Sequence, residues 1–166
     1  MRGNLSGQQL GPYQVGVPIG EGGIGQVYQA VHVRTGRSYA LKVLTDTDES
    51  ALPRFRREAE ALAAIGHPGV VAIHDFNENA EGVAYLVMDH LQGTDLARRI
   101  RHGAVAMDEA LDRFDEVADA LTAAHAAGVL HRDLKPSNIF LRREGDLPER
   151  AVLLDFGLAK SVDPDR

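Results

Sequence analysis

Residues able to do chemistry are concentrated in two short strings late in the chain. The first, HRDLKPSN, spans residues 131–138, and the second, DFG, spans residues 155–157 after an apolar run. DFG alone would be an ordinary turn after a buried strand. Seven specified positions (HRD, the asparagine and DFG) at about one chance in twenty each give a coincidence on the order of 10⁻⁹. Coincidence is therefore a poor explanation of the two strings, which together indicate one shared chemistry.

A glycine cluster near the start of the chain could bind phosphate. Gly20, Gly22 and Gly25 follow the spacing G-x-G-x-x-G, with Val27 two residues later. Glycine lets backbone N–H groups approach phosphate oxygens and tolerates positive φ. The same glycines could make a plain hairpin, or open the helix of a dinucleotide-binding fold. The strand-like run from Val27 to Val31 argues against the dinucleotide fold.

One lysine and one glutamate stand out by their places in the expected elements. Strand alternation puts Lys42 on the same face as Ala40, which suits a flat base against Ala40 and Val27 with the ammonium reaching the phosphates. A lone lysine is more often solvent-facing. At about 100° per residue, however, Glu58 falls inside the apolar stripe of an expected helix, where a carboxylate needs a partner.

Together these motifs resemble those of protein kinases, in particular the eukaryotic-like (Hanks-type) serine/threonine kinases of bacteria. The likeness runs from about Tyr13 to Lys160, and Lys135 in LKPSN is typical of the serine/threonine type. It implies an α+β fold, with a five-stranded antiparallel N-lobe carrying one helix and then the first part of a mainly helical C-lobe. It also implies a signalling enzyme that transfers the γ-phosphate of ATP to serine and threonine hydroxyls of proteins, with Mg²⁺ or Mn²⁺.

The resemblance assigns a role to each motif residue. Asp133 would accept or orient the hydroxyl proton, and Lys135 would steady the transferring phosphoryl group. Asn138 and Asp155 would hold the metal ion. The third-strand lysine would pair with the helix glutamate. The full catalytic set would be Lys42, Glu58, Asp133 and Lys135.

A further set would contact the nucleotide. Met88 would lie beside the adenine as the gatekeeper, Asp89 and Leu91 would belong to the hinge whose backbone binds the base edge, and Phe140 would lie beneath the base. The whole nucleotide set is Gly20, Glu21, Gly22, Gly23, Ile24, Gly25, Val27, Ala40, Lys42, Met88, Asp89, Leu91 and Phe140. An apolar stack linking the lobes of active kinases matches Leu62, Ile73, His131 and Phe156. Core packing explains those four residues equally well.

The remaining pattern predicts the elements that position these groups. We expect a flexible leader over residues 1–11, a nucleotide-binding N-lobe over 12–92 and a partial C-lobe over 93–166. Short apolar and β-branched runs predict strands at residues 13–15, 27–33, 38–44, 70–73, 83–88, 139–141 and 151–154. Apolar repeats predict one helix over 52–65 and a longer one ending near Gly128. One face of the longer helix carries Met107, Leu111, Phe114, Ala118 and Leu121.

Composition argues against several classes of function. The formal charge of -6, from 24 acidic and 18 basic residues, gives no general attraction to nucleic acid or an anionic membrane. The chain has no cysteine, which excludes disulfides and thiolate sites and suits a reducing compartment. It shows no signal peptide and no apolar run near the roughly 18 residues of a spanning helix. We therefore expect a cytoplasmic protein whose partners are ATP and proteins bearing serine or threonine.

Motifs that follow DFG in the kinase family, the activation segment and APE, are not in these residues. We therefore expect an incomplete domain that exposes apolar surface around Phe114 and Leu121 and is poorly soluble alone. An alternative of another class is a truncated nucleotide-binding or regulatory module that binds a partner through this face and transfers no phosphate. Every ATP-binding residue is present, so the motifs do not separate the two hypotheses.

Overall fold

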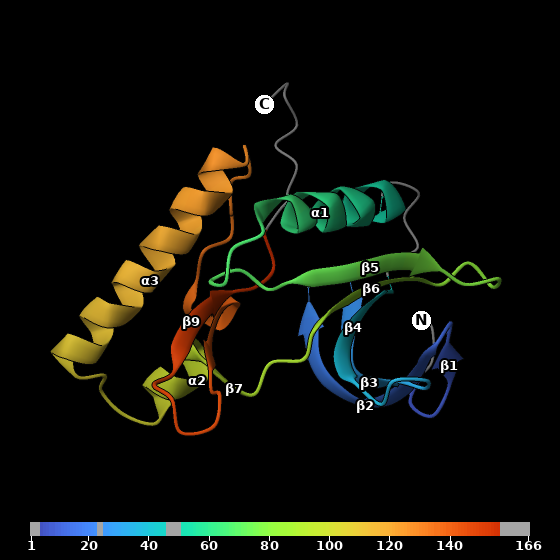
Figure 1. Ribbon diagram of the computed structural model, residues 1–166, viewed down its shortest axis with the longest axis horizontal. Coiled ribbons are helices and arrows are strands. Elements are labelled where there is room, and N and C mark those ends of the chain that lie inside the picture. Colours follow the sequence, from blue (N-terminus) through green and yellow to red (C-terminus); the bar gives the residue numbers. More distant parts are fainter. Residues whose placement is uncertain (1–3, 23–24, 46–50, 157–166) are drawn as a thin grey trace. The chain divides into compact units, whose positions relative to one another are not determined.

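The computed structural model describes residues 4–22, 25–45 and 51–156. They divide into two compact units (Figure 1). The first unit consists of Met1–Glu60 with Ile73–His90, and the second of Ala61–Ala72 with Leu91–Arg166. Each unit contains its own β-sheet.

The sheet of the first unit is antiparallel and has six strands, in the order β1-β2-β3-β4-β6-β5. Its strands are β1 (Gln9–Leu10), β2 (Tyr13–Gly22), β3 (Gly25–His32), β4 (Ser38–Leu44), β5 (Ile73–Glu78) and β6 (Ala84–Asp89). Four of them correspond to the strands expected from apolar and β-branched runs, β5 overlaps the run expected over residues 70–73 only at Ile73, and β1 is additional. The α+β fold and the antiparallel N-lobe are thereby confirmed.

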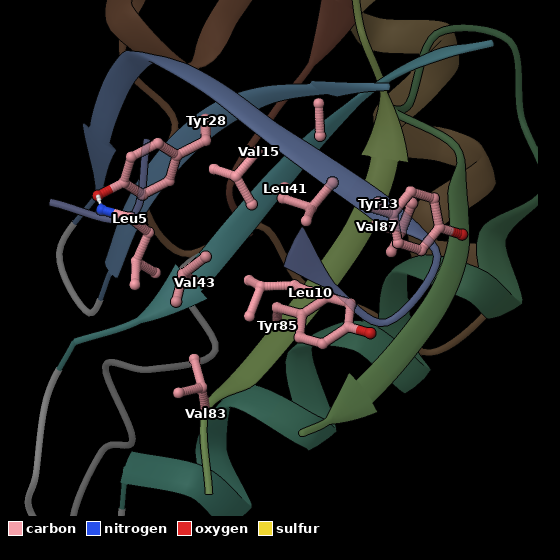
Figure 2. Packing of buried hydrophobic residues seen from close by; sticks show 11 residues of the cluster. Leu5, Leu10, Tyr13, Val15, Tyr28, Leu41, Val43, Val83, Tyr85 and Val87 are labelled. Carbon is pink, nitrogen blue, oxygen red and sulfur yellow. Dashed lines mark hydrogen bonds between the residues drawn. The ribbon is translucent and has the colours of Figure 1, made fainter. Parts of the chain in front are cut away.

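The beginning of the described chain is part of the core and corrects the expectation of a flexible leader. Leu5 and Leu10 are 9% and 2% exposed, and Leu10 pairs with Tyr13 across β1 and β2. Figure 2 shows both leucines among the buried side chains of the sheet, with Tyr85 and Val87 of β6. We expected a flexible leader because the segment is polar and glycine-rich. Burial of its two leucine side chains stabilises an ordered conformation in spite of that composition.

Helix α1 (Ala51–Ile65) has the apolar stripe that the sequence predicts. Phe55, Ala59 and Leu62 are buried at spacings of three and four residues. The Phe55 ring lies 5.6 Å from the ring of Phe76 on β5. The stripe also buries Glu58.

Strand β5 begins at Ile73, later than the strand expected over residues 70–73. Val70 instead forms a parallel bridge with Leu153, and the Val71 N–H donates to the Leu153 carbonyl at 3.0 Å. Residues 61–72 therefore join the second unit, although the sequence interpretation had assigned them to the first lobe. Val70 and Leu153 are 83 residues apart, and pairing over such a distance leaves no local pattern in an apolar run.

The second unit has a three-stranded antiparallel sheet in the order β7-β8-β9. Its elements are β7 (Gly93–Asp95), α2 (Leu96–Arg101), α3 (Met107–Ala126), the short 3₁₀ helix η1 (Pro136–Asn138), β8 (Ile139–Arg142) and β9 (Arg150–Leu153). Asp95 caps α2, because its carboxylate accepts from the Arg98 N–H at 2.8 Å.

Helix α3 buries a different face from the one that its largest apolar residues occupy. Its buried residues are the small Val117, Ala120 and Ala124. Met107 and Phe114 are 76% and 72% exposed, so the apolar surface expected around Phe114 is present. In the parts of the chain that the structure describes, we find no helix with the length and hydropathy to span a membrane.

Candidate active site

Cross-strand pairing in the first unit brings the expected nucleotide-binding residues together. Gly20 pairs with Val27 and Val27 with Lys42, while Ala40 pairs with Met88. Residues directly opposite in antiparallel strands place their side chains on the same face. Val27, Ala40, Lys42 and Met88 therefore share one face of the sheet, as the base and phosphates of a nucleotide would require.

The glycine turn joins β2 to β3 at the end of this face. Glu21 pairs with Gln26 and Gly22 with Gly25, whereas Gly23 and Ile24 lie outside the described residues. A Cβ at Gly25 would collide with the carbonyl oxygen of Val43, so glycine is required there. A plain hairpin would also need close strand approach, so the geometry fits both interpretations of this turn.

Sequence reasoning did not single out Ile19, the residue before Gly20. Its side chain is 47% exposed although it is apolar and lies within β2. Exposed apolar surface beside a glycine turn could cover one side of a flat base. The available signal was its position directly before the first glycine of the cluster.

The lysine and glutamate that the sequence singled out are in contact. The Lys42 ammonium on β4 donates to Glu58 Oε1 on α1 at 2.7 Å. Both residues are buried, at 3% and 2% exposed. Two opposite charges held this deeply balance one another, and each fixes the other's position. Glu60, two residues along α1, is exposed, as the helical stripe predicts.

In the second unit, three residues of the HRDLKPSN string form a polar cluster. Lys135 Nζ donates to Asp133 Oδ2 at 2.8 Å. Asn138 Nδ2 donates to the Asp133 carbonyl oxygen at 2.9 Å and to its Oδ2 at 3.3 Å. The Asp133 carboxylate is 22% exposed, so a hydroxyl could reach it from solvent. The amide of Asn138, only 6% exposed, holds it in place from the inner side.

Backbone hydrogen bonds at Leu154 connect this loop to the DFG string. The Leu154 N–H donates to the Asn138 carbonyl at 2.8 Å, and His131 Nε2 donates to the Leu154 carbonyl at 3.0 Å. The residue before Asp155 is thus held by both ends of the HRDLKPSN string. Sequence reasoning missed Leu154, whose contribution comes from its backbone and leaves no side-chain signal.

His131 is buried beneath the loop and packs against Phe156. Their ring centroids are 4.4 Å apart with the planes tilted by 31°, and His131 is 3% exposed. Burial lowers the pKa of His131 from its ordinary value of 6.5, against the hydrogen bond to Leu154 and the nearby carboxylates, which raise it. A lowered pKa favours the uncharged imidazole. His131 and Phe156, two of the four residues matched to the apolar stack, thus contact each other through their rings.

Two residues of these strings adopt backbone conformations that are unusual for residues other than glycine. Arg132 has φ of 58° and Asp155 has φ of 37°. Such left-handed conformations cost of order 1–3 kcal/mol and persist where the surroundings impose them, commonly at functional sites. Here the hydrogen bonds at Leu154 and the burial of His131 and Phe156 provide those surroundings.

The side chains of Asn138 and Asp155 offer oxygen atoms, the ligand type that Mg²⁺ prefers. Because Asn138 donates through Nδ2, its Oδ1 is the atom left for a cation, and Asp155 adds a carboxylate. Among residues 4–22, 25–45 and 51–156 there is no group of three or more histidine or acidic side chains suited to a metal. Phosphate oxygens and water would have to complete the shell, which is the usual arrangement for Mg²⁺.

The remaining predicted nucleotide residues fall on either side of the division between units. Met88 and Asp89 end β6 in the first unit, whereas Leu91 and Phe140 belong to the second. Phe140 lies on β8, opposite Val152 of β9, and is partly exposed.

Comparisons with known proteins show the family and the fold of this chain. The model of the protein kinase domain matches residues 13–166. Serine/threonine-protein kinase PknA of Mycobacterium tuberculosis (strain ATCC 25618 / H37Rv) is 42% identical over 161 residues, covering 92% of this chain and 36% of PknA. Serine/threonine-protein kinase pkn2 of Myxococcus xanthus is 40% identical over 158 residues, covering 93% of this chain and 19% of the relative.

A solved structure gives the same result for the fold. The kinase domain of Mycobacterium tuberculosis PknI superposes with a TM-score of 0.76 at 34% identity, covering 92% of this chain and 62% of that domain. The chain thus spans about a third of PknA and about three-fifths of the PknI kinase domain. With the domain model matched from residue 13 onward, the chain belongs to the protein kinase family, among its bacterial Hanks-type serine/threonine members.

Proposed function

We propose that this chain contains the nucleotide-binding and catalytic residues of an ATP-dependent protein kinase that phosphorylates serine and threonine in other proteins. The observation that carries the proposal is the cluster around Asp133, in which Lys135 and Asn138 contact one carboxylate. ATP binding alone has no need of a partly exposed carboxylate held in this way. A hydroxyl acceptor does need one, because the attacking oxygen must be oriented and its proton removed.

Each residue then has one task. Asp133 accepts the hydroxyl proton of the substrate, and Lys135, 2.8 Å away, neutralises charge on the transferring phosphoryl group. Lys42, fixed by Glu58, holds the nucleotide phosphates. Asn138 and Asp155 would hold Mg²⁺, which supplies charge neutralisation on the phosphate oxygens. We place this activity in the cytoplasm, where ATP and protein substrates are found together.

The test is an Asp133→Asn variant of the full natural chain, assayed for phosphate transfer from labelled ATP to a protein substrate. We expect turnover to fall roughly 10²–10⁴-fold with little change in ATP affinity. Asp146→Asn, in the exposed turn between β8 and β9, is the matched control and should transfer phosphate like the wild type. Full activity of the Asp133 variant would overturn the assignment.

One observation favours a second candidate, a nucleotide-binding module that transfers no phosphate. Helix α3 exposes Met107, Leu111 and Phe114 at 76%, 58% and 72%, a surface that a partner could cover. This candidate predicts a thermal shift with Mg·ATP, abolished by Lys42→Ala, in a full natural chain that phosphorylates nothing. Phosphate transfer by the wild type rejects it.

A further inference from the structure

We propose that His74 is a positioning residue for the adenine-binding end of β6, acting through a hydrogen bond to Asp89. The inference deepens the proposed function and rests on it, because it concerns the backbone expected to bind the base edge. His74 Nε2 lies 2.6 Å from Asp89 Oδ1. An ionised carboxylate can only accept a hydrogen bond, so Nε2 is the donor.

Asp89 occupies the last position of β6, directly before the segment 90–92, which has no regular structure. On one side its backbone pairs with Tyr39 of β4. On the other side the ladder with β5 ends one residue earlier, where Ile73 lies opposite Met88. The His74 side chain therefore supplies the link to β5 at the position where the backbone ladder has stopped.

A β-bulge directs His74 toward this position. The pairing of β5 with β6 shifts between Ile73 and Asp75, so His74 is the extra residue on its strand. Bulges turn a side chain away from the regular alternation and are common beside functional sites. The Tyr39 ring packs edge-on against the imidazole, with centroids 5.2 Å apart, and limits its movement.

This hydrogen bond lies on the face of the sheet opposite the one that carries Val27, Ala40, Lys42 and Met88. Asp89 lies opposite Tyr39, whereas its neighbour Met88 lies opposite Ala40 on the face that carries Lys42. The Asp89 side chain thus orients the end of β6 from the face away from the nucleotide, and the backbone at this end remains available to bind the base edge. The side chains of His74 and Asp89 are 36% and 40% exposed, so the pair adds little stability, and its effect should appear in nucleotide affinity.

Two substitutions separate the hydrogen bond from the ring contact. His74→Gln keeps an N–H donor for Asp89 and loses the ring, whereas His74→Phe keeps a ring against Tyr39 and loses the donor. In the full natural chain we expect His74→Phe to raise the Kd for Mg·ATP and the KM for ATP by about three- to tenfold. The turnover number and the KM for the protein substrate should stay near wild type, and His74→Gln should restore most of the ATP affinity.

His32→Phe is the control, because His32 also packs edge-on against a tyrosine of this sheet, with its ring 5.3 Å from Tyr13, and lies in none of the sites. It should leave ATP affinity unchanged. An ATP affinity in His74→Phe equal to wild type, or a loss in His74→Gln larger than that in His74→Phe, would overturn the inference while leaving the proposed function intact. A wild-type chain that binds no Mg·ATP would overturn both.

Discussion

Breaking the Lys42–Glu58 pair tests whether the core of the first unit depends on balanced buried charge. In Glu58→Leu the Lys42 ammonium, 3% exposed, would remain in the interior without this carboxylate. Removing one partner of a buried pair typically costs about 3–5 kcal/mol. The free energy of unfolding that urea denaturation measures should therefore fall by about 3–5 kcal/mol.

The double variant Lys42→Met/Glu58→Leu should recover most of this loss, because apolar side chains of similar length replace both charges. It should bind no ATP, since the phosphate-holding ammonium is gone. Glu60→Leu makes the same change at an exposed position of α1 and should alter the free energy of unfolding by less than about 0.5 kcal/mol.

Urea denaturation of the full natural chain, followed by far-UV circular dichroism, measures all four variants against the wild type; the fourth is Lys42→Met, which completes the cycle. Two results would refute the reasoning. One is a Glu58→Leu variant no less stable than Glu60→Leu. The other is a double variant whose loss equals the sum of the two single losses, which would mean that the two charges are not coupled.

Three further predictions concern the second unit. Gly93→Ala should lower the free energy of unfolding by more than about 2 kcal/mol in denaturation experiments, because the φ of Gly93 is 138° and a Cβ there would collide with the Leu141 carbonyl oxygen. Gly103→Ala, at φ of 145° with open space around it, should lower the free energy of unfolding clearly less. The free energy of unfolding of the wild type should fall as pH drops below 6.5, because folding lowers the pKa of His131 and the unfolded chain then binds more protons. The free energy of unfolding of His131→Phe should depend less on pH, and an equal dependence in the two proteins would contradict this. A protein of residues 1–166 should aggregate in light scattering, because Phe114 and its apolar neighbours on α3 are exposed, and Phe114→Ser should reduce the aggregation. A monodisperse wild-type chain that melts cooperatively would disprove this prediction.

The grouping of the candidate site residues was predictable from the sequence where their side chains follow local patterns. The HRDLKPSN and DFG strings named the loop residues directly, and helical periodicity alone placed Glu58 among apolar neighbours and Glu60 outside them. Alternation along β4 placed Lys42 beside Ala40, and the observed register puts Val27 and Met88 on that face too. Where a segment follows a single helical or strand periodicity, that periodicity was sufficient to predict which face each side chain occupies.

What the sequence could not predict depends on pairing between distant backbone segments. The run at residues 70–73 looked like a sheet strand, yet Val70 pairs with Leu153. The bulge at His74 and its contact with Asp89 need the register of β5 against β6, which no local pattern specifies. The burial of Leu5 likewise needs a sheet to bury it. Such contacts are a property of the assembled fold.

The relative placement of Asn138 and Asp155 is a question of strand register. Asn138 directly precedes β8 and Asp155 follows β9 by two residues. Ile139 lies opposite Leu153, which sets Asn138 opposite Leu154 and permits the 2.8 Å hydrogen bond between them.

A slip of one residue in this hairpin would move Asp155 by about 3.3 Å along the strand and reverse which side chains are buried. Ile139 and Leu141 of β8 are 8% and 1% exposed and alternate with the less buried Phe140 and Arg142, so a slip of β8 would turn its two buried apolar side chains out of the core. Two small strands of apolar residues therefore hold the proposed metal ligands in place, and the loop between the two motifs need not be rigid for them to meet.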